Sequence, residues 1–112
     1  MKVKSILVSQ PEPNRIVIDA GSKSLNLDRG AHATQLITGY GRLLNIEGEI
    51  VRLSEEHGVI NLQDDKMIPL GSPVLIIPNH ACAVANLYSD YQFIEVSGNI
   101  IQIPVDARGM SQ

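Results

Sequence analysis

Apolar residues recur at every second position along much of the chain, and this period predicts β-strands rather than helices. The alternation is clearest at 58–62 (GVINL), and the run at 72–77 (SPVLII) is apolar on both faces, as in a central or barrel strand. Further strands are predicted at 3–9, 15–19, 42–46, 49–54, 92–96 and 99–103. About eight short strands at this spacing indicate an all-β fold of the barrel or sandwich type, and we expect a small β-barrel.

Turn-forming residues separate these strands. The prolines of 11–14 (PEPN) should end the first strand, because proline cannot donate to a strand ladder. Glu47-Gly48 and Ser97-Gly98 are predicted to be hairpin turns, the second with a two-residue loop. Residues 22–34 contain few apolar positions, so we expect a long irregular loop there.

One short helix is expected near residues 80–87. Alanine occupies positions 81, 83 and 85, which favours a helix, and Asn79 could cap its first turn. No linker, repeat or charge run divides the sequence, so residues 1–112 are expected to form a single domain.

Composition narrows the classes of function. Hydrophobic residues make up 44% and aromatic residues only 4%, so the core should consist of Ile, Val and Leu. The net charge of −3 and the scarcity of aromatic residues argue against a nucleic-acid partner. The N-terminal apolar run covers only 6–8, and no stretch approaches the roughly 18 apolar residues of a membrane span. The single cysteine, Cys82, excludes an intramolecular disulfide and suits a reducing compartment, so we expect a cytoplasmic protein without a membrane partner.

The sharpest chemical feature lies in residues 78–82 (PNHAC). His80 and Cys82 stand two positions apart, and zinc accepts both imidazole nitrogen and thiolate as ligands. Two protein ligands leave the ion open to water, substrate or further ligands. The same spacing also arises where a buried cysteine acts as a small hydrophobe beside a hydrogen-bonded histidine. The spacing alone leaves both interpretations open.

Three other positions carry groups that could take part in chemistry. Glu56 and His57 could form an acid–base pair or orient a ligand, or they could belong to a solvated charged turn. Tyr40 stands between two glycines, which allow the backbone to approach another group closely. It could donate a hydrogen bond in a site, or pack in the core with its hydroxyl at the rim.

Five segments follow one another in an order that is specific as a set. They are 19–23 (DAGSK), 28–30 (DRG), 39–41 (GYG), 53–58 (LSEEHG) and 78–87 (PNHACAVANL). Together they resemble the C-terminal domain of the D-threonine aldolase and eukaryotic-type D-serine dehydratase family. The resemblance runs from about Ile6 to Val105.

This resemblance implies a fold and a set of partners. Members of the family have the alanine-racemase-like fold, with an N-terminal (β/α)₈ barrel that holds pyridoxal phosphate on a lysine and a C-terminal β-domain. They act as homodimers on small D-amino acids and need a divalent metal ion beside the cofactor. The metal ligands come from the segment matched by His80 and Cys82. Tyr40, Glu56 and His57 would then lie behind these ligands or at the rim of the active site.

The identity of the second ligand distinguishes two branches of the family. The dehydratase branch uses His and Cys with zinc, and the aldolase branch uses His and Asp with manganese or a similar ion. Cys82 therefore leans towards the dehydratase branch, and thiolate does suit zinc better than harder ions. The implied role of the metal ion is to bind the β-hydroxyl of the substrate, while pyridoxal phosphate accepts electrons from the carbanion.

The chain departs from the family pattern because the pyridoxal-phosphate barrel is absent. Lys23 lies in the β-domain and is not the cofactor lysine, so we assign no catalytic or cofactor-binding residue and expect no reaction from this chain alone. The chain is then an excised domain, a truncated gene product or part of a split enzyme. The alternative is a stand-alone β-barrel that binds other proteins through an exposed apolar patch and has no catalytic role.

Overall fold

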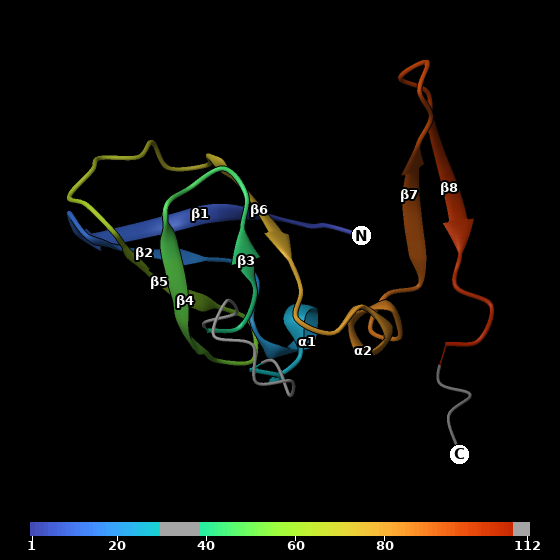
Figure 1. Cartoon of the computed structure of the whole chain (residues 1–112), viewed down its shortest axis with the longest axis horizontal. Coiled ribbons are helices and arrows are strands. Elements are labelled where there is room, and N and C mark those ends of the chain that lie inside the picture. The colour runs from blue at the N-terminus through green and yellow to red at the C-terminus, as the bar shows by residue number, and fades with distance from the viewer. Residues whose placement is uncertain (30–38, 109–112) are drawn as a thin grey trace.

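The computed structural model describes residues 1–29 and 39–108, and over these ranges it contains eight strands and two short helices (Figure 1). The strands are β1 (Val3–Glu12), β2 (Arg15–Ile18), β3 (Arg42–Leu43), β4 (Gly48–Leu53), β5 (Gly58–Leu62), β6 (Pro73–Ile77), β7 (Asp90–Ile94) and β8 (Ile100–Pro104). The helices are α1 (Ser22–Leu25) and α2 (Ala81–Ala85). No helix in the described ranges has the length and apolar character needed to cross a membrane.

Six antiparallel strands form one sheet in the order β3-β6-β1-β2-β5-β4. The sheet curls until its two end strands, β3 and β4, lie side by side (Figure 1). Across this seam the backbone N–H of Tyr40 donates to the carbonyl of Ile50 at 3.2 Å. The result is a nearly closed barrel, which confirms the predicted all-β fold.

The strand alternation places one face of each strand in the barrel interior. On β1, for example, Val3, Ser5 and Leu7 point inward and are buried, whereas Lys4 and Ile6 point outward. The buried apolar residues are Val3, Leu7, Ile16, Ile18, Ala20, Leu25, Ile50, Ile60, Leu62, Val74, Ile76 and Val84. The core described here is therefore aliphatic, as the composition predicts.

The end of the first strand and the role of residues 47–48 differ from the sequence prediction. The first strand continues to Glu12 through Pro11. Proline is tolerated there because β1 pairs with β6 only over Val3–Ile6, so Pro11 lies beyond the part of β1 that is paired on that edge. The predicted hairpin turn at 47–48 does not join paired strands: β3 pairs with β6 and β4 pairs with β5. Closure of the barrel brings β3 and β4 together without a ladder between them.

A second helix, α1, occupies part of the predicted loop at 22–34. The backbone N–H groups of Ser22 and Lys23 donate to the carbonyls of Ser54 and Glu55 at 2.8 and 3.1 Å. A Cβ atom at Gly21 would lie 2.4 Å from both carbonyl oxygens, so only glycine permits this approach. Tertiary contact rather than local propensity thus fixes α1, and residues 30–34 of the predicted loop lie outside the described ranges.

The β7–β8 hairpin stands apart from the barrel beyond α2 (Figure 1). Its loop has three residues rather than the predicted two, because Glu95 N–H donates to Asn99 O at 2.8 Å and Gly98 takes a positive φ of 90°. The opposed pairs Tyr91/Ile103 and Phe93/Ile101 share one face of the hairpin. Phe93 is 56% exposed, so this face presents apolar surface to solvent.

Candidate metal-binding site

His80 and Cys82 lie at the start of α2. His80 is the residue that precedes the helix and has an extended backbone (φ −135°, ψ 99°), while Cys82 lies in the first turn. Both side chains are exposed, so Cys82 is not the buried hydrophobe of the alternative interpretation. Val84 is fully buried and anchors the helix to the core, which holds both potential ligands at the surface.

The imidazole of His80 is oriented by a carboxylate. Its Nδ1 lies 3.1 Å from Oδ2 of Asp28, in a loop that is 52 positions away in the sequence. Both side chains are about half exposed, so the pair contributes little to stability. Its effect is to set the direction of the ring and to leave Nε2 available for another partner.

Asn79 connects this site to two loops. Its Nδ2 donates to the backbone carbonyls of Asp28 at 2.7 Å and Gly39 at 2.9 Å. The predicted cap is therefore wrong: α2 has no side-chain cap, and the amide of Asn79 bridges the loops instead. Gly39 has a positive φ of 71°, and a Cβ there would lie 2.4 Å from the carbonyl oxygen of Ile50.

Tyr40 lies next to this bridge and is partly buried against the core. The guanidinium of Arg29 stands 4.9 Å from the centre of its ring, a cation–π contact. The contact places Tyr40 and Arg29 beside the loop that carries Asp28. Tyr40 packs against the core, as one of the two sequence interpretations has it, and its part in a site stays a prediction.

Glu56 and His57 belong to a separate cluster of contacts beside α1. Lys23 is paired with the carboxylates of Glu56 and Glu55. His57 closes a turn, where its N–H donates to Oγ of Ser54 at 3.1 Å. These contacts match the solvated charged turn that the sequence allowed, and they do not bring either residue to His80.

The donor set at the start of α2 fits a soft divalent ion with open coordination positions. Imidazole and thiolate together favour zinc over magnesium or calcium. Within residues 1–29 and 39–108, no three His, Cys, Asp or Glu side chains converge as a metal-binding group. Asp28 in particular does not join His80 and Cys82 around one point. An ion held here would need ligands from water, substrate or another part of an enzyme.

The partner of His80 was not predicted from the sequence. Residues 28–30 belong to the matching segments, but their pattern indicates no contact for Asp28. No local pattern indicates a hydrogen bond between residues 52 positions apart, so only the fold shows it.

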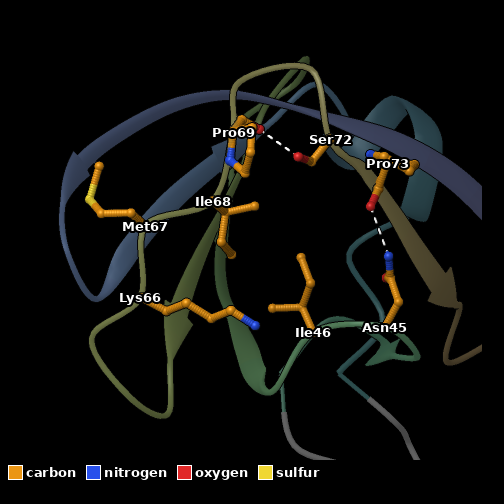
Figure 2. A pocket seen from close by; sticks show the side chains of 8 residues that line it. All are labelled: Asn45, Ile46, Lys66, Met67, Ile68, Pro69, Ser72 and Pro73. Carbon is orange, nitrogen blue, oxygen red and sulfur yellow. Dashed lines mark hydrogen bonds between the residues drawn. The ribbon is translucent and has the colours of Figure 1, made fainter.

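A shallow hollow of about 280 Å³ lies under the loop between β5 and β6 (Figure 2). It is lined by Asn45, Ile46, Lys66, Met67, Ile68, Pro69, Ser72 and Pro73. The amide of Asn45 donates to Pro73 O at 2.8 Å, and the hydroxyl of Ser72 donates to Pro69 O at 2.6 Å. Since these polar groups are used to hold the loop, the hollow offers little to bind a ligand.

Comparison with known proteins identifies the family. Residues 1–94 match the family model described as "Putative serine dehydratase domain". The chain belongs to this family. An uncharacterized protein of Mycobacterium tuberculosis is similar, with 40% identity over 97 residues that cover 85% of this chain and 70% of that protein.

Two enzymes extend the comparison of this serine dehydratase domain. The D-serine dehydratase of Dictyostelium discoideum is 35% identical over 108 residues, covering 87% of this chain and 27% of the enzyme. The crystal structure of D-threonine aldolase from Filomicrobium marinum matches with a TM-score of 0.79 and 28% identity, covering 98% of this chain and 28% of that one. The resemblance to the C-terminal domain of these enzymes is confirmed, and the chain spans under a third of their length.

Proposed function

We propose that this chain is the metal-bearing domain of a pyridoxal-phosphate-dependent lyase that acts on D-amino acids with a β-hydroxyl group. The observation that carries the proposal is the pair His80 and Cys82, exposed together at the start of α2, with the imidazole already oriented by Asp28. Membership of the serine dehydratase family supports it.

Each residue has a defined part in the proposed site. Nε2 of His80 and the thiolate of Cys82 bind the ion, Asp28 orients the imidazole, and the buried Val84 fixes the helix that carries both ligands. A divalent ion held there supplies a Lewis acid for the β-hydroxyl oxygen, and pyridoxal phosphate bound by a barrel domain supplies the electron sink. Two protein ligands leave the positions that water and substrate require.

One observation favours dehydration over aldol cleavage. The thiolate of Cys82 suits zinc, which the resemblance associates with the dehydratase branch. We therefore assign the domain to a D-serine dehydratase type of enzyme.

Lys23 does not fit the role of the cofactor lysine. Its ammonium lies on the surface, where it is paired with Glu56. The cofactor lysine of the proposed enzyme must therefore come from a barrel domain, either on the same polypeptide or on a partner. The resemblance also implies that the assembled enzyme is a homodimer.

The test combines the chain with a separately produced barrel domain of a D-serine dehydratase loaded with pyridoxal phosphate. The expected result is zinc-dependent release of pyruvate and ammonia from D-serine, lost in His80→Ala and Cys82→Ala and retained in His57→Ala. Conversion of D-threonine to glycine and acetaldehyde instead would assign the domain to the aldolase branch. Equal activity in all four proteins would contradict the proposed role of both ligands.

A second candidate function is a protein-interaction module without catalysis. The exposed apolar face of the β7–β8 hairpin favours it. So does the Mycobacterium tuberculosis relative: its 97 matched residues make up 70% of that protein, which leaves it far shorter than a domain plus the roughly 200 residues of a (β/α)₈ barrel. Under this alternative the chain binds a partner through the hairpin and has no zinc affinity that depends on His80.

A further inference from the structure

The contact between His80 and Asp28 determines which ring nitrogen carries the proton. Nδ1 of His80 lies 3.1 Å from Oδ2 of Asp28. An ionised carboxylate can only accept a hydrogen bond, so the neutral imidazole must carry its proton on Nδ1 in this pair. The lone pair is then on Nε2, and a metal ion binds only the nitrogen that has a lone pair.

The position of Asp28 is fixed by the residue next to His80. The side chain of Asn79 donates to the backbone carbonyl of Asp28 at 2.7 Å. Asn79 therefore contacts the backbone of Asp28, and His80 contacts its carboxylate. The same amide donates to the carbonyl of Gly39 at 2.9 Å, so it links the loop that contains Asp28 to the one that contains Gly39.

Asp28 acts on the imidazole and not on the ion. Over the described ranges, no third His, Cys, Asp or Glu side chain gathers with His80 and Cys82 as a metal-binding group. The carboxylate lies behind the ring, on the side of Nδ1. In metal sites a carboxylate in this position orients the imidazole and makes it more basic.

We infer that Asp28, held in place by Asn79, is a positioning residue that keeps the proton of His80 on Nδ1 and presents Nε2 to the metal ion. This inference rests on the proposed function for the presence of the ion. The proton position itself is a property of the metal-free chain, so it can be measured independently.

The first test is a long-range ¹H–¹⁵N NMR spectrum of the histidine rings in the full, metal-free chain at about pH 8, where an ordinary histidine is neutral. The signals of His80 are assigned by their loss in His80→Ala. We expect the Nδ1–H form in the unaltered chain and a shift to the Nε2–H form in Asp28→Ala. The control Asp65→Ala, at an exposed position between β5 and β6, should leave the spectrum unchanged. The Nε2–H form in the unaltered chain would overturn the inference.

The second test measures zinc affinity by competition with a chromophoric chelator. Asp28→Ala should weaken zinc binding about tenfold, at the lower end of what a carboxylate behind a histidine ligand contributes, because the pair is half exposed. Asn79→Ala should weaken it less. The d–d spectrum of the Co²⁺-loaded chain should keep its band positions in both variants, since neither residue is a ligand. Unchanged affinity, or a changed Co²⁺ spectrum in Asp28→Ala, would contradict a positioning role.

The two failures are distinguishable. If the unaltered chain binds no zinc, either alone or with the barrel domain present, the proposed metal site is refuted, whatever the NMR spectrum shows. If zinc binds at His80 and Cys82 but the ring proton of His80 does not respond to Asp28→Ala, the positioning role alone is refuted. An unchanged urea midpoint in Asp28→Ala shows that the variant is folded, as expected for a surface pair.

Discussion

Removal of the carboxylate of Asp19 should destabilise the barrel in a way that depends on pH. Asp19 follows β2, and its Oδ1 accepts hydrogen bonds from Oγ of the buried Ser5 at 2.7 Å and from the N–H of Ile6 at 2.8 Å. Partial burial alone would raise the pKa of Asp19, but the bonds from Ile6 and Ser5, aided by the nearby His57, lower it below 3.8. The folded barrel therefore favours the ionised form.

The size of the effect follows from the two bonds. Hydrogen bonds to a charged group contribute about 1.5–3 kcal/mol and neutral ones about 0.5–1.5 kcal/mol. Asp19→Asn keeps an oxygen in place but loses the charge, so it should lower the free energy of unfolding by about 1 kcal/mol at neutral pH. Asp19→Ala also leaves the buried hydroxyl of Ser5 without its acceptor and should cost about 2–4 kcal/mol. Adding Ser5→Ala to Asp19→Ala should recover part of this loss.

The pH dependence has a definite sign. Because the pKa of Asp19 is lower in the folded state than in the unfolded state, its contribution is fully present above the ordinary value of 3.8. It is lost as the pH falls through the lower folded value. The difference in stability between the unaltered chain and Asp19→Asn should therefore be constant between about pH 5 and 7 and shrink as the pH falls below 3.8.

Urea unfolding followed by circular dichroism measures these differences, provided that the slope with urea is the same in each variant. Asp65→Asn removes an exposed carboxylate between β5 and β6 and serves as the control, with an expected change within about 0.5 kcal/mol. Equal stability of Asp19→Asn and the unaltered chain at pH 7 would refute the reasoning. So would a difference that persists undiminished at acid pH.

Three further predictions concern the seam, the core and the hairpin. Gly39→Ala should lower the free energy of unfolding by about 2–4 kcal/mol in the same assay, because its φ is positive and its Cβ would meet the carbonyl of Ile50; a neutral effect would show that the seam can relax. Ile60→Ala should cost about 2–5 kcal/mol, since Ile60 is fully buried on β5; a loss below about 1 kcal/mol would place it outside the core. Replacing the exposed pair Phe93 and Ile101 with serine should reduce binding of the dye ANS without lowering the urea midpoint; unchanged dye binding would exclude the hairpin as the main apolar patch.

The sequence predicts the strands well where a strand has one buried face and one exposed face. Residues 58–62 alternate and form β5 with the predicted bounds. The short helix near 80–87 is also found, as α2. In these segments the local pattern and the packing agree, so the period of apolar residues is sufficient.

The pattern of apolar residues fails to predict the local structure where contacts between distant parts of the chain determine it. Ser22–Leu25 has little local helical signal and becomes helical because its backbone docks on the carbonyls of Ser54 and Glu55. Asn79 has the composition of a helix cap, but its amide is used to bridge two loops. The potential ligands could be named from a short motif, whereas the carboxylate that orients His80 is 52 positions away and becomes visible only in the fold.

Calorimetric titration of the purified chain with zinc tests whether His80 and Cys82 hold one divalent ion. We expect one zinc ion per chain, loss of binding in both His80→Ala and Cys82→Ala, and unchanged binding in His57→Ala, whose exposed imidazole lies in a separate turn. The titration is repeated in the presence of the barrel domain, which can supply missing ligands. Absence of zinc binding under both conditions, or binding that survives both substitutions, would contradict the account.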